Sequence, residues 1–256
     1  MGWSTLLGVP AEPPVIMERA EVPDALFLSL LLVQGICWIY AYALLIHRGH
    51  VDRYLGIPLF AVVLNLGWEL TFLLVLPIPR QQQPINAAWV LLDLFIIRLA
   101  FQYGRKDFPG LSAAAFKRTI LLALAYSMLF QILLGWELGD NEGIYGALAI
   151  NVYMSYAFID LLRRRRSSAG QSLHIAVAKC VGTFAAGLMF FCWYPERYLL
   201  SLLTLTVLVL DVVYIRLLHR QLRAEGASPF AINRPPVRPP AEAGEAGRAL
   251  VDPVRS

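Results

Sequence analysis

Seven long apolar runs constrain the fold of this chain more than any other feature of its sequence. An α-helix needs about 20 predominantly apolar residues to cross the hydrocarbon core of a bilayer. Apolar residues make up 58% of the 256 residues and charged residues only 16%, which is unlike a soluble domain. The sequence therefore predicts an all-α, polytopic membrane protein, a seven-transmembrane-helix bundle. The expected spans are 24–46, 55–77, 86–103, 116–137, 143–162, 172–193 and 196–218.

The charges in the connections predict which way the bundle faces. Lys and Arg gather in alternate connections, at 47–53, at 105–118, at 163–166 and after the last span. Cytoplasmic connections of membrane proteins carry such an excess of Lys and Arg. We therefore expect the N-terminus outside and the C-terminus in the cytoplasm. The same asymmetry accounts for the net charge of +4, so no nucleic-acid partner is expected.

Short segments flank the expected transmembrane domain, which spans residues 24–222. Residues 1–23 would form an extracytoplasmic N-terminal segment. Residues 223–256 are rich in Pro with scattered Ala, Glu and Arg, and they predict a disordered cytoplasmic tail. The connections are short, so any chemistry must take place inside the bundle. The Ala-, Arg- and Leu-rich composition suggests a bacterial source, and hence a multi-pass protein of the inner membrane.

Several chemistries lack the residues that they need. The four His residues fall at expected inner helix ends and form no ligand cluster, so neither a metal nor another cofactor is expected: His47, His50, His174 and His219. The sequence has no DDxxD motif for a magnesium diphosphate, no phosphate loop and no GxSxG elbow. A retinal protein would need a Lys in its last span, which has none.

Two carboxylates inside apolar spans are the best indication of function. Glu69 lies in the second span and Asp211 in the seventh, and an ionisable side chain in hydrocarbon costs roughly 2.5 to 3.5 kcal/mol on insertion scales. Such residues normally face a bundle interior. Neither has an oppositely charged helical neighbour apart from Arg216 near Asp211, so function is favoured over structure for both. The pentapeptide around Glu69, Leu-Gly-Trp-Glu-Leu, recurs at residues 134–138, where its Glu137 falls at a span end, and we interpret this as coincidence.

Other polar residues occupy single helix faces. Their spacings of three, four or seven residues place these sets on one side of each helix: Asn65 and Glu69; Asn86, Trp89 and Asp93; Asn151 and Ser155; Asp211 and Tyr214. Asp93, Asn151 and Ser155 could equally hold helices together through hydrogen bonds. For Lys179, snorkelling or a buried ion pair is favoured over catalysis.

These motifs resemble the integral-membrane terpene cyclases of meroterpenoid and indole-terpenoid biosynthesis, a family with fungal and actinomycete members. Its members have Asn-x-x-Trp-Glu on the second helix and Leu-Asp-x-x-Tyr on the seventh. The corresponding residues here are Asn65, Trp68 and Glu69, and Leu210, Asp211 and Tyr214. Residues similar to family positions on the third and fifth helices are Trp89 with Asp93 and Asn151 with Ser155. The resemblance covers about residues 24–222.

The resemblance implies cyclisation of a membrane-dissolved prenylated small molecule, with a farnesyl aromatic or indole, or its terminal epoxide, as the expected substrate. Glu69 would be the initiating acid and Asp211 a second acid, base or proton relay. A carboxylic acid in apolar surroundings keeps its proton readily, and aromatic faces stabilise passing carbocations. The ring candidates are Trp38, Trp68, Phe72, Trp89, Tyr153, Phe184 and Phe190. A prenyltransferase or epoxidase would act upstream.

A second class of function uses the same carboxylates. In a proton-coupled transporter or membrane sensor they would bind protons during alternating access. Transporters of this kind have Pro or Gly breaks in paired helices, and here Gly67 is the only Gly near the carboxylates. The terpene cyclase hypothesis is therefore preferred.

The expected topology can be tested with a tag fused to the C-terminus. In inside-out vesicles we expect a protease to remove this tag, because the excess of Lys and Arg places the C-terminus in the cytoplasm. Protection of the tag in those vesicles would refute the orientation.

Overall fold

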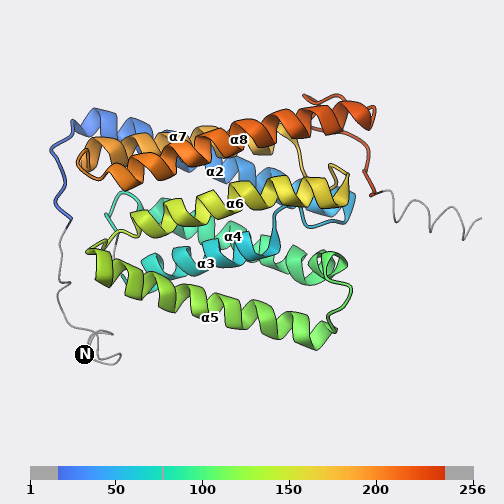
Figure 1. Ribbon diagram of the computed structural model, residues 1–256, viewed down its shortest axis with the longest axis horizontal. Coiled ribbons are helices and arrows are strands. Elements are labelled where there is room, and N and C mark those ends of the chain that lie inside the picture. The colour runs from blue at the N-terminus through green and yellow to red at the C-terminus, as the bar shows by residue number, and fades with distance from the viewer. Residues whose placement is uncertain (1–16, 77, 240–256) are drawn as a thin grey trace, which may run out of the picture.

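The expected helical bundle is confirmed by the computed structural model, which describes residues 17–76 and 78–239 (Figure 1). Within these residues the elements are α2 (Asp24–Asp52), α3 (Leu59–Leu74), α4 (Gln83–Tyr103), the 3-10 turn η1 (Gly104–Asp107), α5 (Ala113–Leu138), α6 (Ile144–Arg165), α7 (Leu173–Trp193) and α8 (Tyr198–Ala224). Each expected span overlaps one α-helix, and α2 and α8 continue past the expected ends at residues 46 and 218 to Asp52 and Ala224. Six of these helices are long and apolar enough to cross a membrane.

Helix α3 is shorter than the second expected span. It has 16 residues, or about 24 Å at 1.5 Å per residue, which is less than the hydrocarbon thickness of about 30 Å. Pro58 takes the N-cap position with a ψ of 131°, and a residue that precedes proline is disfavoured in the helical conformation. Residues 55–57 therefore remain outside the helix. The expected boundaries of 55–77 are corrected to Leu59–Leu74.

Helix α3 lies at the centre of the bundle. It packs against α4, α5 and α6, while α2 packs against α4 and α7, and α8 covers α6 and α7. In Figure 1, α5 runs along one side of the molecule and α2, α7 and α8 along the opposite side. Most α3 residues are buried, Glu69 among them. The shortest helix thus carries its carboxylate into the interior, while the outer faces of α5 and α8 expose Leu and aromatic side chains such as Leu122 and Leu202 to the bilayer.

The connections α2–α3 and α6–α7 meet backbone to backbone at the end of the bundle where α2 finishes. A Cβ on Gly56 would lie 2.0 Å from the carbonyl oxygen of Gly170, and Gly170 has a φ of +77°. Only glycine allows this approach and this backbone conformation. The contact fixes the ends of α2 and α6 relative to each other.

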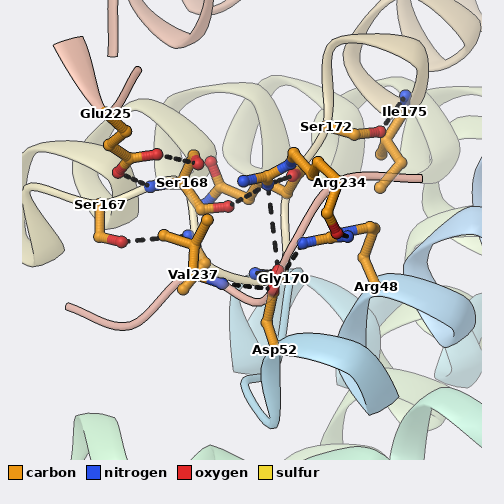
Figure 2. Close-up of polar contacts among 12 residues, drawn as sticks. Arg48, Asp52, Ser167, Ser168, Gly170, Ser172, Ile175, Glu225, Arg234 and Val237 are labelled. Carbon is orange, nitrogen blue, oxygen red and sulfur yellow. Dashed lines mark hydrogen bonds and ion pairs between the residues drawn. The ribbon is translucent and has the colours of Figure 1, made fainter. Parts of the chain in front are cut away.

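The chain after α8 also packs onto this end, so the expected disordered tail must be corrected for residues 223–239. Helix α8 continues to Ala224. Arg234 is buried and donates hydrogen bonds to the carbonyl oxygens of Ser168 at 3.0 Å and Gln171 at 2.5 Å (Figure 2). The composition of the tail predicted disorder because it gives no information about these backbone acceptors in another part of the chain. Residues 240–256 lie outside the described residues.

Asp52 is the other anchor of this tail. Its carboxylate accepts hydrogen bonds from the Arg48 guanidinium at 2.5 Å and from the backbone N–H groups of Gly170 at 2.7 Å and Val237 at 2.9 Å (Figure 2). Arg48 in turn donates to the carbonyl oxygen of Arg234 at 2.9 Å. The side chains of Arg48 and Asp52 are fully buried, so this ion pair depends on all of its partners.

We expect Arg234→Ala to lower the melting temperature of the purified protein clearly. The change removes the buried guanidinium that holds the tail, and breaking a buried polar network of this kind costs about 3 kcal/mol or more. Arg238→Ala is the matched control, since Arg238 is an exposed arginine in the same segment. Equal melting temperatures for the two variants would show that the tail contributes nothing to the fold.

Candidate active site

A cavity of about 90 Å³ lies between α2, α3, α4, α6 and α7, near the bundle end where α2 begins. Its wall has aromatic and polar parts. The aromatic residues are Phe27, Trp38, Trp68, Trp89, Phe190 and Trp193. The polar residues are Gln34, Tyr42, Asn65, Glu69, Gln82, Glu142, Asn151 and Thr183. Of the expected site residues, Glu69, Asn65, Trp68, Trp89 and Asn151 therefore share one cavity.

Glu69 is held in a cluster of four polar side chains. Its Oε1 accepts hydrogen bonds from the Asn65 amide at 2.7 Å and from the Tyr42 hydroxyl at 3.1 Å. The Asn65 amide also donates to Asp93 Oδ2 at 3.0 Å. Asn65 and Glu69 are one helical turn apart on α3, which brings both to the same face. One amide thus links two carboxyl groups from adjacent helices.

The cluster contains no cation among its hydrogen-bond and ion-pair partners in the part of the chain that the structure describes. Glu69 and Asp93 are each about 1% exposed. Two ionised carboxylates in such surroundings would repel each other, so a pair of this kind shares a proton. Among the described residues, Glu69 Oε2 and Asp93 Oδ1 have no hydrogen-bond partner. Glu69 therefore has an oxygen available to hold or release that proton.

Backbone contacts fix the helices on either side of Glu69. Asn86 on α4 donates to the carbonyl oxygen of Glu69 at 3.0 Å, and Trp68 Nε1 donates to the carbonyl oxygen of Gly143 at 2.7 Å. Gly143 has a φ of +68°, and a Cβ there would lie 2.2 Å from the Phe72 ring. The α5–α6 connection must therefore have glycine at this position to receive the Trp68 side chain.

Asp211 has a different environment from the one expected. Both of its oxygens accept hydrogen bonds from Lys179 Nζ, at 2.8 and 2.9 Å, and Lys179 also donates to Ser155 at 2.7 Å. The sequence argument weighed only charges on the same helix as Asp211, such as Arg216, and so did not find this partner. Lys179 is on another helix, and its buried ion pair agrees with the structural alternative considered for it.

Some expected site residues lie behind the cavity wall. Asp93, Ser155, Asp211 and Tyr214 are not among the lining residues. Tyr214 is buried and donates to Gln171 Oε1 at 3.0 Å, toward the end of the bundle where the tail packs. The structure therefore separates the Glu69 cluster from the Asp211 ion pair.

The aromatic candidates divide in the same way. Trp38, Trp68, Trp89 and Phe190 line the cavity, whereas Tyr153 and Phe184 lie on the outer surface with 38% and 45% of their area exposed. The last two candidates are therefore not part of the cavity wall. Phe72 packs against Trp68, with ring centroids 4.9 Å apart.

Sequence reasoning missed several lining residues, including Phe27, Gln34, Tyr42, Gln82, Thr183 and Trp193. Gln34 carried a usable signal, because an amide inside a membrane-length apolar run normally faces the bundle interior. It donates to Gln82 Oε1 at 3.1 Å, which links α2 to the start of α4. The others look like ordinary apolar or interfacial residues in the sequence.

The segment before α2 contacts residues at one edge of the cavity. Arg19 forms an ion pair with Glu142 and lies over the Trp193 ring, 4.0 Å from its centroid. Phe27 packs against the same ring at 5.2 Å. Burial raises the pKa of Glu142 above its ordinary value, because the loss of solvent outweighs the attraction of Arg19. A charged pair and two aromatic rings therefore lie together at this edge of the cavity.

A family model describing Pyr4-like transmembrane terpene cyclases matches residues 10–221, which include every residue of the Glu69 cluster and the Lys179–Asp211 pair. The chain belongs to this family. It is a multi-pass membrane protein of a terpene cyclase family, as the motifs around Glu69 and Asp211 implied.

Curated relatives agree with this assignment. The Pyr4-family terpene cyclase mfmH of Annulohypoxylon moriforme is 26% identical over 82% of this chain and 90% of its own length. The terpene cyclase olcD of Penicillium canescens is 27% identical over 79% of this chain and 86% of its own length. No solved structure matches the chain. Both relatives are fungal, so the comparisons do not support the bacterial source suggested by composition.

Proposed function

We propose that the chain cyclises a membrane-dissolved polyprenyl aromatic or indole, carrying a farnesyl chain or its terminal epoxide, by a reaction that Glu69 starts as a proton donor. The observation that carries this proposal is the position of Glu69, a buried carboxyl group with neutral hydrogen-bond partners in the wall of an aromatic cavity. The names of the two relatives above include the words terpene cyclase.

Glu69 would act as a general acid. Its proton passes to the epoxide oxygen or to the terminal alkene carbon of the substrate, and a carbocation forms. The π electrons of the next alkene then form a carbon–carbon bond, and loss of a proton to a base ends the reaction without a change of mass. The Asn65 amide donates a hydrogen bond to the resulting Glu69 carboxylate and so stabilises it, and the proton released at the end of the reaction regenerates the acid.

The cavity wall suits the cationic intermediates. Trp38, Trp68 and Trp89 present aromatic rings that stabilise a cation without reacting with it. The apolar interior of the bundle limits the access of water, which would otherwise quench the cation. No group of three His, Cys, Asp or Glu that could bind a metal is found among the described residues, and this favours proton initiation over metal-assisted ionisation.

The cavity must enlarge to take a prenylated ring system. Its volume of about 90 Å³ is below the roughly 300 Å³ at which sites for drug-sized ligands begin. Phe27, Trp193 and the Arg19–Glu142 pair at the edge of the cavity are the groups that would move aside. The substrate also implies the upstream enzymes. A prenyltransferase must attach the prenyl chain, and an epoxidase must form any terminal epoxide.

Glu69→Gln separates acid catalysis from packing. The amide keeps the shape and the hydrogen-bonding capacity of the side chain but cannot donate a carboxylic proton. We expect normal accumulation in the membrane and a loss of cyclisation of roughly a hundredfold or more. The assay incubates membranes with a farnesyl indole and its terminal epoxide, and measures isomers of unchanged mass.

Glu137→Gln is the control for this test. This substitution is at the equivalent position of the second Leu-Gly-Trp-Glu-Leu sequence, where the Glu is exposed at the end of α5. The variant should retain activity. A well-expressed Glu69→Gln protein with wild-type turnover would contradict the proposal. So would a wild-type activity that EDTA abolishes and magnesium restores, or ligand-driven proton flux without isomerisation.

A further inference from the structure

Lys179 and Asp211 form a second buried polar site below the cavity. Their side chains are 2% and 1% exposed, and the ammonium lies within 2.9 Å of both carboxylate oxygens. Because Lys179 also donates to Ser155, one ammonium connects α6, α7 and α8. A buried charge with no partner is strongly unfavourable, so each member of the ion pair depends on the other.

Helices α6 and α7 are joined by a second side-chain hydrogen bond, one helical turn closer to the cavity. Lys179 and Thr183 are one turn apart on α7, and Asn151 and Ser155 are one turn apart on α6. Lys179 donates to Ser155 at 2.7 Å, and Thr183 donates to Asn151 Oδ1 at 3.3 Å. The Thr183–Asn151 contact lines the cavity and the Lys179–Ser155 contact does not. The register that Lys179 sets between α6 and α7 therefore also sets the position of Asn151 and Thr183 in the cavity wall.

Charge gives the pair a second consequence for the cavity. Lys179 Nζ lies 6.0 Å from the centre of the Trp38 ring, and Trp38 is part of the wall. An ammonium without its counter-ion at this place would repel a carbocation held against that ring. Asp211 neutralises the ammonium, and both of its oxygens are occupied in doing so.

We propose that Lys179 is a positioning residue of the cyclase and that Asp211 serves the reaction through Lys179, without exchanging a proton with the substrate. The pair fixes the α6–α7 wall and presents a neutral face to the cavity. This inference rests on the proposed cyclase function. It assigns the acid step to Glu69, because Glu69 lines the cavity and Asp211 does not.

The test compares Lys179→Gln, Asp211→Asn and the double variant. Each single change leaves one buried charge unpaired and should lower kcat/KM by roughly a hundredfold, the loss expected when a distant change misplaces a site. In the double variant two neutral amides can hydrogen-bond to each other. We expect kcat/KM to recover at least roughly tenfold over either single variant, with the wild-type products.

Two controls make the result specific. Asp160→Asn breaks the exposed Asp160–Arg164 pair on α6 and should leave activity unchanged. Adding Lys179→Gln to Glu69→Gln should rescue nothing. Melting temperatures of the purified variants give a readout that needs no activity, and the double variant should again be more stable than the two losses added together.

Three results would overturn the inference. The first is a stable double variant as inactive as Asp211→Asn, since a substituted acid or base cannot be rescued by its neighbour. The second is wild-type activity in Lys179→Gln. The third is additive losses of melting temperature. Wild-type protein without isomerisation would instead refute the proposed function, and the melting temperatures would still decide whether the pair is coupled.

Discussion

The bundle depends on burying carboxyl groups in a membrane interior at a tolerable energetic cost. Each carboxyl group there must be neutral, paired with a cation or hydrogen-bonded, because hydrocarbon offers no water to solvate it. The protein does this in two different ways. Glu69 and Asp93 share the Asn65 amide without a cation, whereas Asp211 is neutralised by Lys179. In the proposed reaction the Glu69 cluster supplies the proton, and the Lys179–Asp211 pair does not.

The helices that carry these groups lie on different sides of the cavity. The short helix α3 is buried on most sides, so Glu69 enters the cavity from the centre of the bundle. Helices α6 and α7 form the opposite wall through Asn151 and Thr183, and α8 lies outside them. The aromatic rings between the two walls provide apolar surface that tolerates a positive charge. In the proposed reaction, Glu69 would supply the acid, the aromatic rings would stabilise the cation, and α6 and α7 would form the fixed opposite wall.

The sequence predicted most of the helices and part of the site, for physical reasons. Bilayer thickness fixes how long an apolar run must be, so most helix ends were placed within about three residues. The exceptions are the start of α3, which Pro58 sets, and the ends of α2 and α8, which continue past the apolar runs into Arg- and His-containing turns. The spacing of Asn65 and Glu69 placed them on one face, because only one helix is involved. The Lys179–Asp211 pair depends on the rotation of two helices about their axes, which weakly periodic membrane sequences leave open. The packed tail was missed for a similar reason, since the acceptors of Arg234 are backbone carbonyls of a loop.

The central claim is that Glu69 holds a proton in the resting protein. Infrared spectra of the wild-type protein and of Glu69→Gln in membranes at neutral pH test it without a substrate. A neutral carboxylic acid has a C=O stretching band that an ionised carboxylate lacks. The account predicts this band in the wild-type spectrum and its loss in Glu69→Gln. Loss of a carboxylate band with no change in the carboxylic acid band would show that Glu69 is ionised, and would contradict its role as the initiating acid.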